Sequence, residues 1–472
     1  MKHLYRLTNI LSDFQQNKGG CFFIMSVKHL VNIKCNYISN TAQTKDSAAI
    51  FMVYVTVKLN PGSYPVIQVL NYACNFTLNK ASQIVYVKAK RKSVRSIFIQ
   101  NIKCTFIKTM VMNPTKRLYH SNIFTLKVNK QHAIIYSSKC TFHKNFAQGL
   151  FQILRNNHFA GHCREHLNGW IIHEDSVFAS NEGHCLHVED IKYVMIRNCI
   201  FVGNVAKNKE YAGSVLFLKT YYIGDLNVVF MNCSFLYNKA EEGGVFYISI
   251  NDYQYHCFSN QRTKEMQQRI YVKIILQIAS CLFLENLANK FGTILAGTNH
   301  YLESQSPKIS IKIVRNKFKS HSKLNKLMLQ NGSVFHINNV PCNIILKQCI
   351  TELVNFEILM HIQNANILTI EKCIYKGNFQ YDFGCIFVLK TKVVIMSNTK
   401  FQGMGFKKKS NRAISMNQIY RIILYKSYFI GNEAGRIIFL QKSQNCIILK
   451  CFFRYNIAIK QTIIDFRSIS SQ

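Results

Sequence analysis

The stretch Cys233-Ser-Phe-Leu-Tyr-Asn-Lys-Ala-Glu-Glu-Gly-Gly-Val-Phe-Tyr-Ile-Ser-Ile250 decides the fold, because its pattern recurs along the chain. A Cys and an aromatic residue stand two positions apart, Asn238 follows, and the pair Gly243-Gly244 precedes an alternating apolar strand. Written as Cys/Ser-x-Phe/Tyr-x-x-Asn, the motif begins at Ser12, Cys35, Cys74, Cys140, Ser176, Cys199, Cys233, Cys281, Cys373, Ser427 and Cys451. Degenerate copies begin at Cys104, Asn316, Cys349 and Thr399. This recurrence indicates a repeat architecture.

The spacing of the motif identifies the kind of repeat. Ser12 and Cys35 are 23 residues apart, and Cys349 and Cys373 are 24 apart. A strand-rich unit of this length is too short for a pair of helices and is typical of one coil of a β-solenoid. We therefore predict an all-β fold, a single-stranded parallel β-helix of about fifteen coils, that forms one continuous domain over residues 1–472.

The longer spacings indicate loops that are inserted at the side of the β-helix. Such interruptions occur at residues 110–121, 154–170, 251–270 and 299–308. In a solenoid, loops of this kind emerge laterally and can form a binding surface, although drift in an exposed loop explains any one of them.

Each motif position has an expected role in the coil. The Cys and the aromatic residue lie two positions apart on a strand, so both should face the interior. Asn tolerates the left-handed backbone conformation and can turn the chain at a corner, and stacked Asn side chains can bond to one another between coils. The pair Gly243-Gly244 supplies a second corner where a Cβ would clash.

The two ends of the chain show no polar or amphipathic cap, so we expect a segment of a longer protein. The longest apolar runs fall short of the roughly 18 residues that a membrane-spanning helix needs, so no transmembrane segment is predicted in this chain. The first residues make a poor signal peptide. An extracellular or cell-surface location is expected if the longer protein is membrane-anchored.

The chain is strongly basic, with 59 Lys and Arg against 22 Asp and Glu, a formal charge of +37. This excess favours polyanions such as acidic glycans, nucleic acid or anionic lipid headgroups. The alternative is a compositional bias, because the basic residues are spread through all repeats and only Lys407-Lys408-Lys409 forms a compact run. No signature of a specific nucleic-acid module is present.

Several copies of the repeat carry a resemblance to known proteins. Segments such as Phe76-Thr-Leu-Asn79 and Phe235-Leu-Tyr-Asn238, with glycine pairs at Gly19-Gly20 and Gly243-Gly244, resemble the repeats of polymorphic outer-membrane proteins. More broadly they resemble the pectin-lyase-like right-handed parallel β-helix superfamily, and also Cys-rich β-helix surface proteins of eukaryotic microbes. The resemblance implies a right-handed helix with a surface or adhesive role. The autotransporter-type membrane barrel of the bacterial proteins is not found in this sequence.

Many β-helices of this superfamily act on polysaccharides, which makes a carbohydrate-active lyase or hydrolase the main alternative. Such an enzyme needs clustered carboxylates, or acidic Ca²⁺ ligands with a basic proton acceptor. The 8 aspartates are scattered, and no two lie within two positions of each other. We therefore predict no catalytic residues and no cofactor.

The region from His158 to Asp190 is the one chemically dense segment, with six of the 16 histidines. Two clusters have local spacing compatible with transition-metal ligation: His162, Cys163 and His166, and His184 with Cys185 and His187. The alternative is a polar loop between coils, with Cys185 an ordinary core residue. The metal candidates are thus His162, Cys163, His166, His184 and His187.

Together these patterns predict a non-catalytic structural or binding segment of a cell-surface or secreted protein. Its expected partners are glycans or surface proteins. The alternatives are the carbohydrate-active enzyme and a surface that binds polyanions electrostatically.

Overall fold

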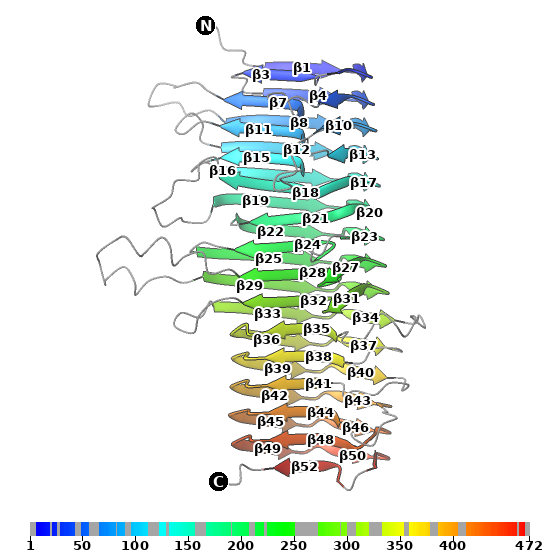
Figure 1. Cartoon of the computed structure of the whole chain (residues 1–472), viewed down its shortest axis with the longest axis vertical. Helices are drawn as coiled ribbons and strands as arrows, with labels where there is room; N and C mark the ends of the chain where they lie inside the picture. The colour runs from blue at the N-terminus through cyan, green and yellow to red at the C-terminus, as the bar shows by residue number, and fades with distance from the viewer. Residues whose placement is uncertain are drawn as a thin grey trace, which may run out of the picture. The chain divides into compact units, whose positions relative to one another are not determined.

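The fold was analysed in a computed structural model of the whole chain (Figure 1). The structure describes residues 6–18, 21–25, 29–42, 49–55, 66–81, 83–89, 96–111, 122–128, 132–155, 167–189, 191–206, 213–220, 224–250, 272–292, 294–299, 308–320, 333–353, 358–377, 386–404, 412–459 and 462–467. Every strand pair within these ranges is parallel. The described residues contain no helix long and apolar enough to cross a membrane.

The chain divides into two compact units. The first comprises residues 1–207, 214–228 and 252–270, and the second comprises residues 208–213, 229–251 and 271–472. The division falls within β25 (Gly224–Met231). Both units repeat the same coil, in which one strand precedes the motif, a short strand lies within it, and one strand follows. We call the sheets formed by these strands sheet 1, sheet 2 and sheet 3.

The first unit stacks the early coils. Sheet 1 contains β1 (Arg6–Ile10), β4 (His29–Ile33), β8 (Val66–Tyr72), β12 (Ser96–Ile102), β16 (His132–Ser138), β19 (Leu167–Glu174) and β22 (Ile191–Arg197). Sheet 2 contains β2 (Asp13–Gln15), β5 (Asn36–Ile38), β9 (Asn75–Thr77), β13 (Thr105–Ile107), β17 (Thr141–His143), β20 (Val177–Ala179) and β23 (Ile200–Val202). Sheet 3 contains β3 (Phe22–Met25), β6 (Thr41–Ala42), β7 (Ala49–Val55), β10 (Lys80–Ala81), β11 (Gln83–Ala89), β14 (Met110–Val111), β15 (Asn122–Val128), β18 (Phe146–Arg155), β21 (Glu182–Glu189) and β24 (Leu216–Thr220).

The second unit continues the pattern. Its sheet 1 contains β29 (Val272–Ala279), β33 (Lys308–Val314), β36 (Cys342–Lys347), β39 (Ile367–Glu371), β42 (Val393–Ser397), β45 (Arg421–Tyr425) and β49 (Asn445–Leu449). Sheet 2 contains β26 (Ser234–Leu236), β30 (Leu282–Leu284), β34 (Lys317–Ser320), β37 (Ile350–Leu353), β40 (Ile374–Gly377), β43 (Lys400–Gln402), β46 (Tyr428–Ile430) and β50 (Phe452–Arg454). Sheet 3 contains β28 (Phe246–Ile250), β32 (Leu295–Asn299), β35 (Ser333–Asn338), β38 (Ile358–Gln363), β41 (Ile386–Leu389), β44 (Arg412–Asn417), β48 (Arg436–Gln441) and β52 (Ile464–Arg467). Two short pairs, β27 (Lys239–Glu242) with β31 (Leu287–Phe291) and β47 (Glu433–Ala434) with β51 (Ile457–Ala458), complete it.

The predicted all-β parallel β-helix is confirmed by this stacking. Within each unit the strands lie one above another in Figure 1, with one strand of sheet 1 and one of sheet 2 in each coil. The single domain over residues 1–472 stays a prediction, as does the expectation of a longer protein. In the last described coil, Leu449, Phe452 and Tyr455 are exposed.

Stacked aromatic rings form the centre of each unit. In the first unit the rings of the motif stack in neighbouring coils with centroids 4.6–5.0 Å apart, in the order Phe14, Tyr37, Phe76, Phe106, Phe142, Phe178 and Phe201. In the second unit Thr351 interrupts the column between Phe318 and Tyr375. The prediction that the aromatic residue and the Cys both face the interior is confirmed, because Cys35 and Tyr37 are both fully buried.

The motif Asn residues form hydrogen-bonded ladders, which confirms their predicted stacking; Thr109 and Met404 interrupt them, each donating only its backbone N–H to the Asn of the next coil. Asn181 donates its side-chain amide to Phe142 O of the preceding coil and to Asn204 Oδ1 of the following coil, both at 2.9 Å. Its own Oδ1 accepts the backbone and side-chain N–H groups of Asn145, both at 3.0 Å. Each ladder Asn therefore satisfies buried backbone groups that would otherwise lack partners.

The prediction that these Asn residues adopt the left-handed conformation is wrong. The left-handed residue is the one directly before the Asn, as at Ser180 (φ 53°) and Tyr237 (φ 56°), and a second one lies directly before the motif Cys, as at Asn232 (φ 53°). The physical reason is that the Asn side chain must point inward to bond the ladder, so its neighbour makes the turn. The glycine corner is confirmed at Gly243 (φ 57°), where a Cβ would lie 2.2 Å from Phe246 O.

Candidate functional site

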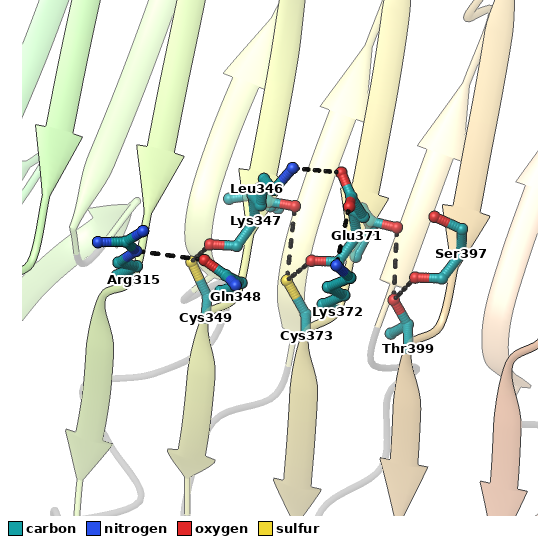
Figure 2. Close-up of polar contacts among 11 residues, drawn as sticks. Arg315, Leu346, Lys347, Gln348, Cys349, Glu371, Lys372, Cys373, Ser397 and Thr399 are labelled. Atoms are coloured by element: carbon teal, nitrogen blue, oxygen red, sulfur yellow. Dashed lines mark hydrogen bonds and ion pairs between the residues drawn. The ribbon is translucent and has the colours of Figure 1, made fainter.

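The motif Cys side chains are donors to the backbone of the coil. Figure 2 shows that the single S–H group of Cys373 is shared between Leu346 O of the preceding coil, 3.5 Å from Sγ, and Glu371 O, 3.4 Å from Sγ. One coil later, Thr399 Oγ1 makes the equivalent bonds to Ile370 O and Ser397 O. The described cysteines are all free thiols. A hydroxyl therefore takes the place of the thiol in these backbone contacts.

The carboxylates on the outside of the second unit form ion pairs with basic residues of the same or the adjacent coil. In Figure 2, Glu371 lies between Lys347 Nζ, 3.0 Å from Oε2, and Lys372 Nζ, 3.9 Å from Oε1. Glu352 contacts Lys319 and Lys376, both at 3.4 Å. These pairs are partly exposed and contribute little stability individually.

The acidic pair Glu241-Glu242 of the opening stretch belongs to the same class of contacts. Lys290 Nζ lies 3.5 Å from Glu241 Oε1 and 3.7 Å from Glu242 Oε1. Asn289 also donates to Glu241 Oε2 at 2.9 Å. Each of these carboxylates therefore has a partner in the following coil.

The predicted metal ligands His184 and His187 lie together on β21. Their ring centroids are 5.8 Å apart, and both rings pack on Phe217 of β24, at 4.8 and 5.2 Å. Both side chains are buried. The adjacent Cys185 is fully buried, and burial raises the pKa of its thiol far above the ordinary value. The local geometry is that of an aromatic cluster.

The other metal candidates, His162, Cys163 and His166, lie outside the described residues. Across the ranges that the structure describes, no three His, Cys, Asp or Glu side chains come close enough together to hold a metal ion. The metal site therefore stays a prediction that rests on the sequence, with His184 and His187 as its described part.

A second histidine pair was not anticipated from the sequence. His336 on β35 and His361 on β38 occupy the same register, with ring centroids 4.8 Å apart, and Phe387 follows in the next coil. Burial, and then the neighbouring charge of His361, lower the pKa of His336 to about 4. The two residues are 25 positions apart in the sequence, so only knowledge of the coil register could have paired them.

Exposed lysines gather at the left-handed corners. Lys103 and Lys139 precede the motif Cys in adjacent coils, and Lys108 and Lys144 occupy the corner before the ladder position in the same coils. All four side chains are exposed. We call these four residues the lysine corner. The sequence contained a signal for it, because a Lys directly before the motif also occurs at Lys34, Lys372, Lys426 and Lys450. The compact run Lys407-Lys408-Lys409 lies outside the described residues.

Comparison of the chain with protein-family models, with curated proteins and with solved structures finds no match. The resemblance to the pectin-lyase-like superfamily therefore rests on the repeat residues themselves.

Proposed function

We propose that this chain is a non-catalytic binding segment, a β-helix that presents its outer corners and lateral loops to ligands as part of a cell-surface or secreted protein. The observation that carries the proposal is the sorting of side chains by position. Inward Cys, aromatic and Asn residues bond or stack with those of neighbouring coils, and outer carboxylates pair with lysines. The exposed corner residues vary along the chain, as Ser180, Tyr237 and Lys144 show, which gives different parts of the surface a different chemistry.

The proposed ligands are glycans or surface proteins. The test is to measure binding of the purified chain to an array of neutral and acidic glycans, and to assay the bound polysaccharides for new reducing ends and unsaturated products. Binding without turnover is expected. Steady release of products would overturn the proposal and favour the carbohydrate-active alternative.

A second candidate function, electrostatic binding of polyanions, is supported by the lysine corner. Stacked parallel strands lie about 4.8 Å apart, so Lys103 and Lys139, and likewise Lys108 and Lys144, repel each other in adjacent coils. A polyanion that spans the two coils would relieve this repulsion and release counterions.

This second function can be tested by heparin retention at increasing salt. A variant with Lys103, Lys108, Lys139 and Lys144 all changed to Gln should elute at lower salt. The slope of the logarithm of its binding constant against the logarithm of the salt concentration should also become shallower by about 3, because each lost phosphate- or sulfate-type contact removes roughly 0.7–0.9 of that slope. The matched control changes the ion-paired Lys290, Lys319, Lys347 and Lys376 to Gln, with the same change in charge. Equal losses in the two variants would leave only a general charge effect and overturn the assignment to the lysine corner.

A further inference from the structure

Three arginines surround one aromatic ring on sheet 3 of the second unit. β44, β48 and β52 are paired in parallel, and Arg412, Arg436 and Arg467 come from these three strands in turn. Phe439 on β48 and Asp465 on β52 share one register. Three successive coils thus each contribute one guanidinium group to a single cluster.

The ring of Phe439 acts as a platform for the three cations. The guanidinium carbon of Arg412 lies 3.5 Å from the ring centroid, that of Arg436 lies 5.2 Å away, and that of Arg467 lies 5.6 Å away. Phe439 is only 1% exposed, so these side chains shield it from solvent. Cation–π attraction restrains planar guanidinium groups, which then lose less conformational freedom when they bind a ligand.

The charges of the cluster do not balance. Asp465 Oδ2 accepts from Arg436 Nε and lies 3.4 Å from Arg467 Nε. Among the described residues no carboxylate forms an ion pair with Arg412. Burial, followed by the charges of Arg436 and Arg467, lowers the pKa of Arg412. Three guanidinium groups against one carboxylate leave a formal charge of +2 in a partly buried place.

We propose that Arg412, Arg436 and Arg467 form a binding site for one tetrahedral oxyanion, the sulfate or phosphate group of a ligand. A guanidinium presents its N–H donors as a planar fork that matches such oxygens in pairs. Asp465 shows that two of the three forks already converge on one anionic oxygen. A dianion would neutralise the remaining charge. The site lies on sheet 3, away from the lysine corner in the sequence, and needs none of those lysines.

The test uses the full chain, titrated by calorimetry with sodium sulfate and sodium phosphate, with chloride holding the ionic strength constant. Saturable binding is expected, and Arg412→Gln should weaken it at least tenfold. Galactose 6-sulfate and glucose 6-phosphate then separate the two sources of the oxyanion by their relative affinity. The matched control is Arg421→Gln, an exposed arginine of β45 outside the cluster, which should bind like the unchanged chain.

Asp465→Asn distinguishes a ligand site from a purely structural cluster. Removing the internal carboxylate frees Arg436 and Arg467, so affinity for sulfate or phosphate should rise several-fold. If Arg412→Gln does not fold, Arg467→Gln provides the same measurement, because 56% of that side chain is exposed. The proposal would be overturned if the affinity for sulfate or phosphate were the same in the unchanged chain, in the arginine variant (Arg412→Gln or Arg467→Gln) and in Asp465→Asn.

Discussion

Asn181 and Asn204 are 23 residues apart in the chain, yet Nδ2 of the first donates to Oδ1 of the second at 2.9 Å within the buried ladder. Asn181 also binds Phe142 O and accepts two bonds from Asn145. One side chain therefore bonds polar groups of both neighbouring coils and links three consecutive coils. Its removal would leave several buried donors and acceptors without partners.

Asn181→Ala should lower the free energy of unfolding by about 3–5 kcal/mol, since each orphaned buried group costs about 1–3 kcal/mol. Asn181→Asp should be worse at neutral pH, because a buried carboxylate cannot donate to Phe142 O. Asn36→Ala is the control: its amide bonds the exposed Asp13, and the loss should stay below about 1 kcal/mol. Urea denaturation measures all three, and an equal midpoint for the two alanine variants would contradict the ladder's role.

The second prediction concerns His173, which is 0% exposed and lies between Ser137 and Ile196 in the register of sheet 1. Neither ring nitrogen has a hydrogen-bond partner among the described residues. The nearest aromatic ring is that of Phe151, whose centroid lies 4.3 Å from the centroid of the imidazole. Burial lowers the pKa of His173 to about 3. As the pH falls, the imidazole of His173 is thus protonated near pH 6.5 in the unfolded chain but only near pH 3 in the folded chain.

Stability should therefore fall by about 1.4 kcal/mol for each pH unit below about 6.5 on account of this residue. His173→Ile, which copies Ile196 of the next coil, should stabilise the protein by about 1–3 kcal/mol at pH 7, and by more at pH 5. The matched control is His143→Ile, which removes a histidine from a partly exposed position of β17. Denaturation curves at pH 5 and pH 7 give the free energy of unfolding at each pH. If its change between the two pH values were the same in His173→Ile as in the unchanged chain, this explanation would be refuted.

Two glycines separate the effect of steric clash from that of backbone conformation. Gly243 and Gly431 both have left-handed φ angles, of 57° and 60°. A Cβ at Gly243 would meet Phe246 O at 2.2 Å, but nothing lies within 4 Å of a Cβ at Gly431. Gly243→Ala should cost about 3 kcal/mol or more, because backbone must move, and Gly431→Ala about 1 kcal/mol. Similar melting temperatures for the two variants would contradict the steric account.

The thiol column should accept a hydroxyl. At the Cys349 position of other coils, Ser176 Oγ donates to Glu174 O at 2.8 Å and Ser427 Oγ donates to Tyr425 O at 3.2 Å. Cys349→Ser should therefore change stability by less than about 1 kcal/mol, whereas Cys349→Leu should overpack the column and cost about 1–3 kcal/mol. Thermal unfolding compares them, and a Ser variant as unstable as the Leu variant would show that sulfur is specifically required.

The sequence predicted those parts of the coil whose chemistry repeats. Cys, aromatic and ladder Asn residues recur at fixed offsets, so their inward direction and stacking followed from spacing alone. The corner residues escaped prediction, because the outward side chain at a left-handed corner can be Ser180, Tyr237 or Lys144. The burial of His173 was not predicted either, since it lies in an ordinary strand where earlier coils carry Asn101 and Ser137.

The arginine cluster shows why sites made by stacking are hidden in the sequence. Arg412 and Arg436 are 24 positions apart, and Arg467 follows 31 positions later. They meet only because β44, β48 and β52 are aligned by pairing. The unequal lengths of the intervening loops remove any fixed spacing that could have indicated their proximity.

The strict register between neighbouring coils has a consequence for how this protein can change in length. Ile350 pairs with Ile374, and Cys349 and Cys373 occupy equivalent places one coil apart. Excision of residues 350–373 would join two equivalent corners and leave the thiol and aromatic columns unbroken, whereas loss of a single residue from a strand would turn the inward side chains that follow it outward. Insertions and deletions that preserve the packing should therefore comprise complete coils, and variants of this chain should differ in length by whole coils.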